Sequence, residues 1–274
     1  FLKNYFDSKK KEKISFLVIS PKGTSFLICS SKGSIFSMRV PDGDLINKSN
    51  FHCTPKEGCV TCQITGCDFD ETGNFFAIGC SYGFVELWNI QLKPKKRLWI
   101  EKKILGLKWD LKSDLIMFSC KDHSLYLVFP ENFSAPRVFR GHSGPLNDFR
   151  IFGSSTFLAT ASMDCSVKIW ELSKNFCIDT LVNKYPTIAL NFDQNETCLV
   201  STHRNTTGVG VWKINNSFWY YNSGKSLEKA RKSKKEEETF SIFSNYGREI
   251  SSQIKSMGFL FKKNSYNKLF LYEK

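Results

Sequence analysis

The stretch that decides the fold is CSVKIWEL, residues 165–172, because four other stretches share its spacing of apolar and polar residues. They are GSIFSMRV (33–40), GFVELWNI (83–90), HSLYLVFP (123–130) and GVGVWKIN (208–215). Alignment of the five places in register Met38, Trp88, Val128, Trp170 and Trp212, at separations of 50, 40, 42 and 42 residues. A near-constant period of this length is the mark of a repeat protein.

The interior of each repeat indicates antiparallel strands. In GCDFDETGNFFAIGCSYGFVELWNI (66–90), an alternating segment with Cys67 and Phe69 is followed by the turn DETGN, the run FFAIGC, the turn SYG and the Trp-bearing segment. Period-2 alternation with Gly and Asn between the runs is typical of half-buried strands. Four short strands in about 42 residues predict one blade of a β-propeller.

The repeat that begins with RGHSGPLNDF (140–149) is the most complete. Its Gly141-His142 pair precedes Trp170 by 28 residues, and Ser162 and Asp164 lie between them. These residues resemble the WD-repeat family, in which a Gly-His pair opens the repeat and a Trp closes its third strand. The resemblance implies a hydrogen-bonded structural tetrad of His142, Ser162, Asp164 and Trp170 that staples the blade.

The resulting fold class is an all-β WD-repeat β-propeller with about five recognisable blades over residues 14–218. Seven blades are usual in the family, so we expect these five to be part of a seven-blade ring, with blades upstream of Phe1 or closure by other segments. Residues 1–13 form a basic lead-in, and 219–238 a charged linker or helix. The C-terminal tail, 239–274, is expected to be helical from the spacing of Ile254, Met257, Leu260 and Phe261.

A hydrolase is the alternative interpretation of the same residues. His142, Ser162 and Asp164 are the residue types of a catalytic triad, but a triad needs an exposed nucleophile and an oxyanion hole. Ser162 instead lies in an alternating strand without a G-x-S-x-G sequence around it. We therefore expect no catalytic residue and no small-molecule substrate.

Cysteines raise the question of a metal. Cys59 and Cys62 form a C-x-x-C, which can supply half of a tetrahedral zinc site, but the second half is absent at the usual spacing. Other cysteines follow apparent strands, as expected of reduced and mostly buried thiols: Cys29, Cys80, Cys120 and Cys198. We expect no metal and no cofactor, with zinc the alternative that metal analysis would test.

The charge of the chain points to an acidic partner. Its 274 residues carry a formal net charge of +13, and a basic surface speeds encounters with nucleic acid. The run KPKKRLWIEKK (93–103) could follow a phosphate backbone, with Trp99 as a stacking face, through Lys95, Lys96, Arg97, Lys102 and Lys103. Solvated lysines encoded by an AT-rich genome are the alternative. No apolar run approaches the roughly 18 residues of a membrane span, so we expect no membrane partner.

Two segments extend the resemblance to a particular nucleolar family. ETGNFFAIGCSYGFVELWNIQ (71–91) and the stretch from Ala159 to Phe218 look like repeats in the second propeller of the WD-repeat protein of the small-subunit processome, which associates with U3 small nucleolar RNA. The matching features are Gly73-Asn74-Phe75, Asn89-Ile90-Gln91, the SMD turn before Trp170, Cys177-Ile178-Asp179, Ser201-Thr202-His203, Gly208-Val209 and Trp212.

This resemblance implies a non-enzymatic scaffold that helps to assemble the small ribosomal subunit in the nucleolus. Its expected partners are other WD-repeat subunits of the processome, with pre-rRNA or U3 RNA as direct ligands. The family also has an additional propeller upstream and a longer, partly helical C-terminal domain, neither of which is complete here. A WD-repeat adaptor in splicing, vesicle coats or a ubiquitin ligase is the alternative.

Overall fold

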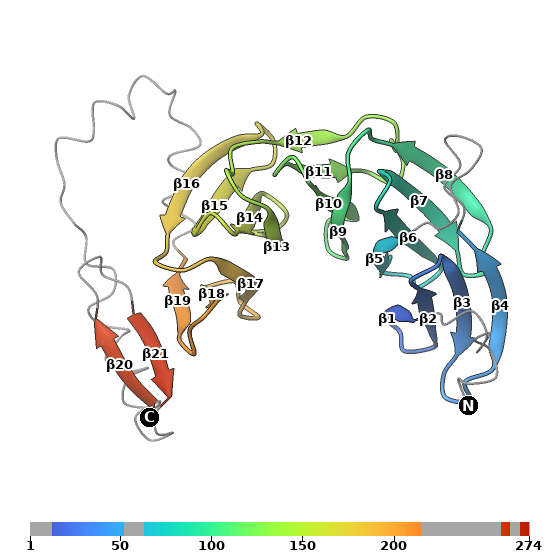
Figure 1. The fold of residues 1–274 in the computed structure, drawn as a ribbon, viewed down its shortest axis with the longest axis horizontal. Helices are drawn as coiled ribbons and strands as arrows, with labels where there is room; N and C mark the ends of the chain where they lie inside the picture. Colours follow the sequence, from blue (N-terminus) through green and yellow to red (C-terminus); the bar gives the residue numbers. More distant parts are fainter. Residues whose placement is uncertain (1–12, 52–62, 215–258, 264–268, 274) are drawn as a thin grey trace. The chain divides into compact units, whose positions relative to one another are not determined.

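The computed structural model describes residues 13–51, 63–214, 259–263 and 269–273, and every regular element in these ranges is a β-strand. The strands form five antiparallel sheets, four of them four-stranded and built from consecutive strands (Figure 1). Each sheet is called a blade below and numbered in chain order. The described residues contain no helix that is long and apolar enough to cross a membrane.

Two compact units divide the chain at Gly141 and His142. The first unit holds blades 1 to 3. Blade 1 contains β1 (Ile14–Ile19), β2 (Ser25–Ser30), β3 (Ser34–Arg39) and β4 (Leu45–Asn50). Blade 2 contains β5 (Ile64–Phe69), β6 (Phe75–Cys80), β7 (Phe84–Asn89) and β8 (Pro94–Trp99). Blade 3 contains β9 (Ile104–Asp110), β10 (Leu115–Cys120), β11 (Leu125–Val128) and β12 (Arg137–Phe139).

The second unit holds blades 4 and 5. Blade 4 contains β13 (Leu146–Phe152), β14 (Phe157–Ser162), β15 (Ser166–Glu171) and β16 (Phe176–Val182). Blade 5 contains β17 (Thr187–Phe192), β18 (Cys198–His203) and β19 (Val209–Lys213), followed by β21 (Leu269–Glu273) and β20 (Phe259–Lys263). β21 thus takes the place beside β19 that the fourth strand has in the other blades.

The helical tail predicted for 239–274 is wrong where the structure describes it. Residues 259–263 and 269–273 form the antiparallel hairpin β20–β21. The segments FLFKK and LFLYE each contain two aromatic residues, and aromatic residues favour strands. The expected linker 219–238 and most of the basic lead-in lie outside the described residues.

The repeat alignment predicted from sequence is confirmed by the strand registers. The five aligned residues each lie opposite the second strand of their own blade, in the pairs Phe26–Met38, Phe76–Trp88, Ile116–Val128, Leu158–Trp170 and Leu199–Trp212. The all-β propeller class therefore follows directly from the period of the sequence.

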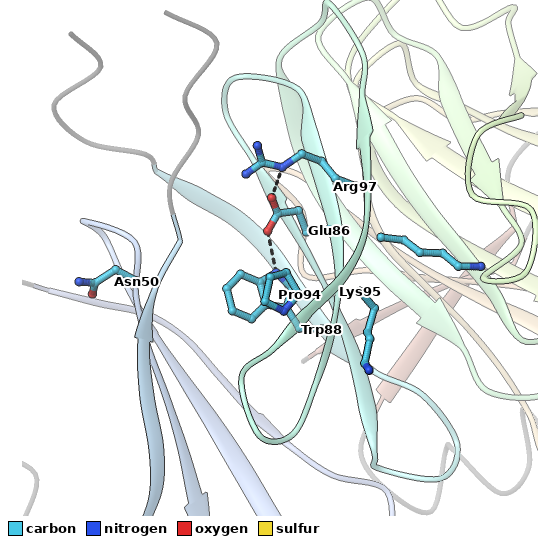
Figure 2. A pocket seen from close by; sticks show the side chains of 7 residues that line it. Asn50, Glu86, Trp88, Pro94, Lys95 and Arg97 are labelled. Carbon is cyan, nitrogen blue, oxygen red and sulfur yellow. Dashed lines mark hydrogen bonds and ion pairs between the residues drawn. The ribbon is translucent and has the colours of Figure 1, made fainter. Parts of the chain in front are cut away.

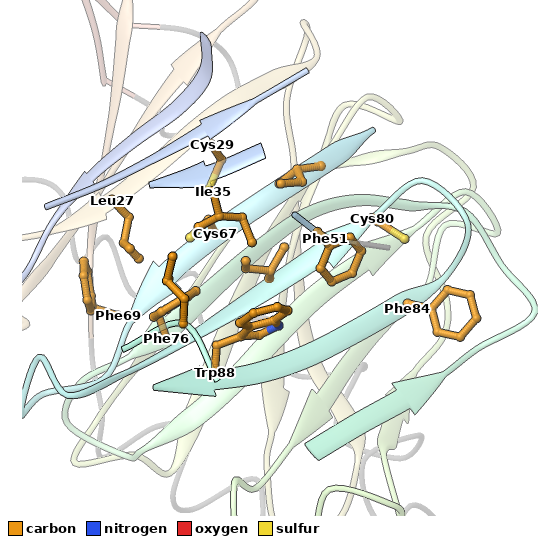
Figure 3. Close-up of a cluster of buried hydrophobic side chains, with 13 residues drawn as sticks. Leu27, Cys29, Ile35, Phe51, Cys67, Phe69, Phe76, Cys80, Phe84 and Trp88 are labelled. Atoms are coloured by element: carbon orange, nitrogen blue, oxygen red, sulfur yellow. The ribbon is translucent and has the colours of Figure 1, made fainter. Parts of the chain in front are cut away.

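Apolar residues between neighbouring blades form the core. Leu27, Cys29 and Ile35 of blade 1 pack against a group from blade 2 that includes Phe76 and Trp88 (Figure 3). A second cluster joins blades 2 and 3, and a third joins blades 4 and 5. Blade 2 is covered on one face by blade 1 and on the other by blade 3, so β6 and β7 are each buried at all but one residue.

Aspartates reinforce two of these contacts. Asp68 Oδ2 accepts a hydrogen bond of 2.9 Å from the backbone N–H of Trp109, on the first strand of the next blade. Asp148 Oδ2 accepts a bond of 2.8 Å from the backbone N–H of Leu190 in the same manner. Hydrogen bonds to a charged acceptor are stronger than neutral ones, so each aspartate holds two successive blades together.

Candidate functional site

A buried chain of polar side chains crosses blade 4. His142, 2% exposed at its side chain, lies 2.8 Å through Nδ1 from Asp164 Oδ2. Its Nε2 lies 2.7 Å from the hydroxyl of Thr160, and this hydroxyl accepts a hydrogen bond of 2.8 Å from Trp170 Nε1. Indole N–H is a donor only, so the bonds run from Trp170 to Thr160, from Thr160 to His142 and from His142 to Asp164 when the imidazole is neutral.

Thr160, and not Ser162, supplies the hydroxyl between His142 and Trp170. Ser162 lies two residues further along β14, where it donates a bond of 2.8 Å to the backbone carbonyl of Gly144 and accepts one from the backbone N–H of Asp164. The two residues lie on the same face of the strand, because side chains alternate with a period of two. The placement of Ser162 in the predicted tetrad is therefore corrected, and Thr160 takes its position.

Asp164 is held ionised by its neighbours. Burial disfavours the charged carboxylate, but hydrogen bonds from Ser166, from His142 and from the backbone N–H of Ser143 outweigh it and lower the pKa of Asp164 from 3.8 to about 2. Gly144 allows the turn to come this close, since a Cβ there would lie 2.9 Å from the backbone nitrogen of Asp164. The network thus ties the Gly-His loop to the turn between β14 and β15.

The chemistry open to this network is limited by burial. The order threonine, histidine, aspartate is that of a catalytic triad, but Thr160 is 1% exposed and its hydroxyl already accepts the Trp170 bond. A substrate cannot reach a nucleophile in this position. Buried polar groups that satisfy one another serve as a structural link.

Blade 5 builds a second network from different residues. Ser201 accepts a bond of 3.0 Å from Trp212 Nε1 and lies 3.1 Å from His203 Nε2. His203 Nδ1 lies 3.4 Å from the hydroxyl of Thr187, which accepts a bond of 3.0 Å from Asn183 Nδ2. His203 lies opposite Thr187 in blade 5, and the equivalent pair in blade 4 is Ser162 and Leu146. The histidine of the blade 5 network therefore lies on a strand, whereas His142 lies in a loop.

A single register rule locates the hydroxyl in both networks. Leu158 lies opposite Trp170 and Thr160 follows two residues later, and Leu199 and Ser201 have the same relation to Trp212. In blade 2 the corresponding residue is Ile78, which has no hydroxyl. Trp88 Nε1 instead donates a bond of 2.8 Å to Glu86 Oε2 on its own strand. In the sequence, the hydroxyl residue lies 10 residues before Trp170 and 11 residues before Trp212.

The five predicted RNA-contacting cations do not form one continuous set. Lys96 Nζ donates bonds of 2.7 and 2.9 Å to the backbone carbonyls of Pro130 and Glu131. Arg97 pairs with the buried carboxylate of Glu86, and Lys102 pairs with Asp122, which raises the pKa of Lys102. In the part of the chain that the structure describes, the side chains of Lys95 and Lys103 form no hydrogen bond or ion pair.

The cysteines of the described ranges are all free. Cys29, Cys80 and Cys120 are buried, whereas Cys198 is half-buried. Burial, with a contribution from Asp122, raises the pKa of the Cys120 thiol to about 12, which leaves it protonated and a poor metal ligand. No group of three potential metal ligands occurs among the described residues, and Cys59 and Cys62 lie outside them.

Comparison with known proteins places the blade 4 network in a family context. Residues 134–171, which include the Gly-His pair and Trp170, match the WD40 family, described as "WD domain, G-beta repeat". The chain contains a WD40 repeat. A solved structure of the Cps50 (Swd1) β-propeller domain from Myceliophteria thermophila superimposes with a TM-score of 0.61 at 12% identity, covering 76% of this chain and 69% of that one. This likeness supports the propeller fold alone.

The WD40-repeat chain is also similar to curated proteins of three kinds. It is 24% identical over 215 residues to the U3 small nucleolar RNA-associated protein 21 homolog of Schizosaccharomyces pombe, covering 62% of this chain. It is 28% identical over 141 residues to pre-mRNA-splicing factor cwf17 of the same yeast, and 23% identical over 129 residues to eukaryotic translation initiation factor 3 subunit I of Meyerozyma guilliermondii, covering 50% and 46% of this chain. The chain spans 23%, 42% and 37% of these relatives' lengths.

Proposed function

We propose that the chain is a non-enzymatic scaffold in ribosome biogenesis that acts in small-subunit rRNA processing within the U3 small nucleolar ribonucleoprotein. The observation that carries the proposal is the similarity to a U3 small nucleolar RNA-associated protein over 62% of the chain. The other two relatives align over 50% and 46% of it. The expected location is the nucleolus, and the expected partners are other WD-repeat subunits of the processome.

The buried networks support a binding role over catalysis. His142 and His203, which a hydrolase would need as bases, both lie inside hydrogen-bonded chains that end on the closing tryptophans. What the blades leave available is their edges and loops, which present shaped and charged surfaces. A net charge of +13 suits an RNA-rich assembly, because neutralising phosphates releases counterions and strengthens binding.

Splicing is the second candidate, since the splicing factor shows the higher identity, 28%, over the shorter alignment. Affinity purification of the tagged chain from its own cells, followed by protein identification and RNA sequencing, separates the two. Our proposal predicts enrichment of U3 RNA, small-subunit pre-rRNA and other processome propellers. Enrichment of spliceosomal RNAs and proteins instead would contradict it and favour the splicing adaptor.

A further inference from the structure

Blade 2 carries a pocket whose lining residues belong neither to the blade 4 network nor to the blade 5 network. It has a volume of about 330 Å³ and lies between Asn50, at the end of β4 in blade 1, and the β7 and β8 strands of blade 2 (Figure 2). The remaining lining residues combine basic, aromatic and proline side chains with one buried carboxylate: Glu86, Trp88, Pro94, Lys95, Lys96 and Arg97. Both blades belong to the first unit.

The pocket carries a net positive charge. Glu86 is 2% exposed, and its two carboxylate oxygens bind Arg97 and the indole of Trp88, so the Glu86–Arg97 pair is neutral. Lys96 Nζ bonds the backbone carbonyls of Pro130 and Glu131, so its charge is held at blade 3. Lys95 has no side-chain partner among the described residues. The charge of Lys95 therefore attracts an anion to this pocket.

An exposed aromatic ring continues the pocket along the same strand. Trp99 ends β8 and is 52% exposed, although its ring stacks on Phe84 with centroids 6.2 Å apart. Arg97 also lies over the Phe84 ring, at 5.0 Å. Trp99 is the one exposed tryptophan among the described residues, and it follows Lys95 by four residues on β8. Cations that contact phosphates, with an aromatic face for a base, are the features of a single-strand binding surface.

We propose that this pocket and Trp99 bind single-stranded RNA, with a phosphate at Lys95 and a base stacked on Trp99. The inference rests on the proposed function, which supplies the RNA. An acidic peptide is less suited to the site. Pro94 opens β8 without an N–H, and lysines follow it, a combination that blocks the addition of a further strand to a sheet edge.

The test measures binding of a fluorescent ten-nucleotide oligouridine to the full chain by anisotropy over a range of salt concentrations. Trp99→Ala should weaken binding at least about fivefold, the loss of one stacked base. Lys95→Gln should weaken it about threefold or more and lower the slope of log Kd against log salt by about 0.7, the loss of one single-strand phosphate contact. The matched control Lys103→Gln removes an equally unpartnered lysine outside the pocket and should change Kd less than about twofold.

Three results would overturn the inference. Equal weakening by Lys95→Gln and Lys103→Gln would indicate diffuse charge, and unchanged binding by Trp99→Ala would remove the stacking contact. A polyglutamate peptide is the third probe. If it displaces the RNA and binds the Trp99→Ala chain as tightly as the native chain, the pocket is a site for acidic peptides. If a Lys95→Gln, Trp99→Ala chain still recovers U3 RNA from cells, the proposed function holds without this RNA site. If the native chain binds oligouridine in vitro as predicted but recovers no U3 RNA from cells, the RNA site holds and the proposed function is wrong.

Discussion

His142 connects a loop to the interior of its blade through two hydrogen bonds, one to Thr160 and one to Asp164. Replacement by Ala should lower the free energy of unfolding by about 1–3 kcal/mol, because the partners are left buried without a bond. A double-mutant cycle with Thr160→Val should give a coupling energy of about 0.5–3 kcal/mol, as expected for residues in contact. The cycle with Ser162→Ala should give a smaller coupling energy, because Ser162 does not bond His142 and shares only Asp164 with it. Chemical denaturation measures both, and coupling to Ser162 alone would contradict the network.

Asp164 gives blade 4 a pH dependence of known sign. Its pKa is lowered on folding from 3.8 to about 2, so its contribution is fully present above pH 3.8 and is lost as the pH falls through about 2. The unfolding free energy of the native chain should therefore fall more steeply between pH 4 and 2 than that of Asp164→Asn. Denaturation at a series of pH values tests this. Parallel curves for the two proteins would show that the pKa of Asp164 does not fall on folding.

The residues of the network were only partly predictable. Gly141-His142, Asp164 and Trp170 stand out in the sequence because their types are rare and their spacing is distinctive. Thr160 and Ser162 are both hydroxyls on one face of β14, and only the register of β14 against β15 decides which one reaches Trp170. Blade 5 was harder still, since His203 lies on a strand and Asn183 holds the position that His142 has in blade 4.

At the scale of the element, Gly210 on β19 shows how closely the second network is packed. A Cβ there would lie 2.5 Å from Ser201 Oγ and 3.0 Å from His203 Nε2. Gly210→Ala should therefore destabilise the chain by roughly 1–3 kcal/mol, the usual cost of overpacking a buried site. Gly106→Ala on β9 is the matched control, because its Cβ would meet nothing closer than 3.6 Å and should leave stability unchanged or slightly raised. Equal stability of the two variants in denaturation experiments would contradict the described packing.

Element types followed from the sequence wherever the repeat held. Apolar runs and turn residues predict the strands of the repeats, although strands such as β6 and β7 are buried on both faces and not on one. The tail followed no repeat, and its short apolar runs fit a helix or a strand equally well. Residues 259–263 and 269–273 pair with each other as a hairpin, and the pairing of β21 with β19, far away in the chain, joins this hairpin to blade 5.

At the scale of the whole molecule, the buried polar residues of blades 4 and 5 serve to hold the blades together. The residues that resemble a catalytic site are buried in the blades, whereas the outer strand β8 exposes Trp99 and its three basic residues. The basic run 93–103 was predicted as a single RNA-contacting set. The structure divides it, because Lys96 bonds backbone carbonyls, Arg97 and Lys102 pair with carboxylates, and Lys95 lines a pocket. Partner choice of this kind depends on tertiary contacts that no sequence pattern specifies.

The measurement that tests the central claim most directly is the ratio of mature small-subunit to large-subunit rRNA after depletion of the protein from its cells. A scaffold of small-subunit rRNA processing predicts a selective fall in small-subunit rRNA and accumulation of its precursors, restored by the native chain. An unchanged ratio together with retained introns in messenger RNA would contradict the claim.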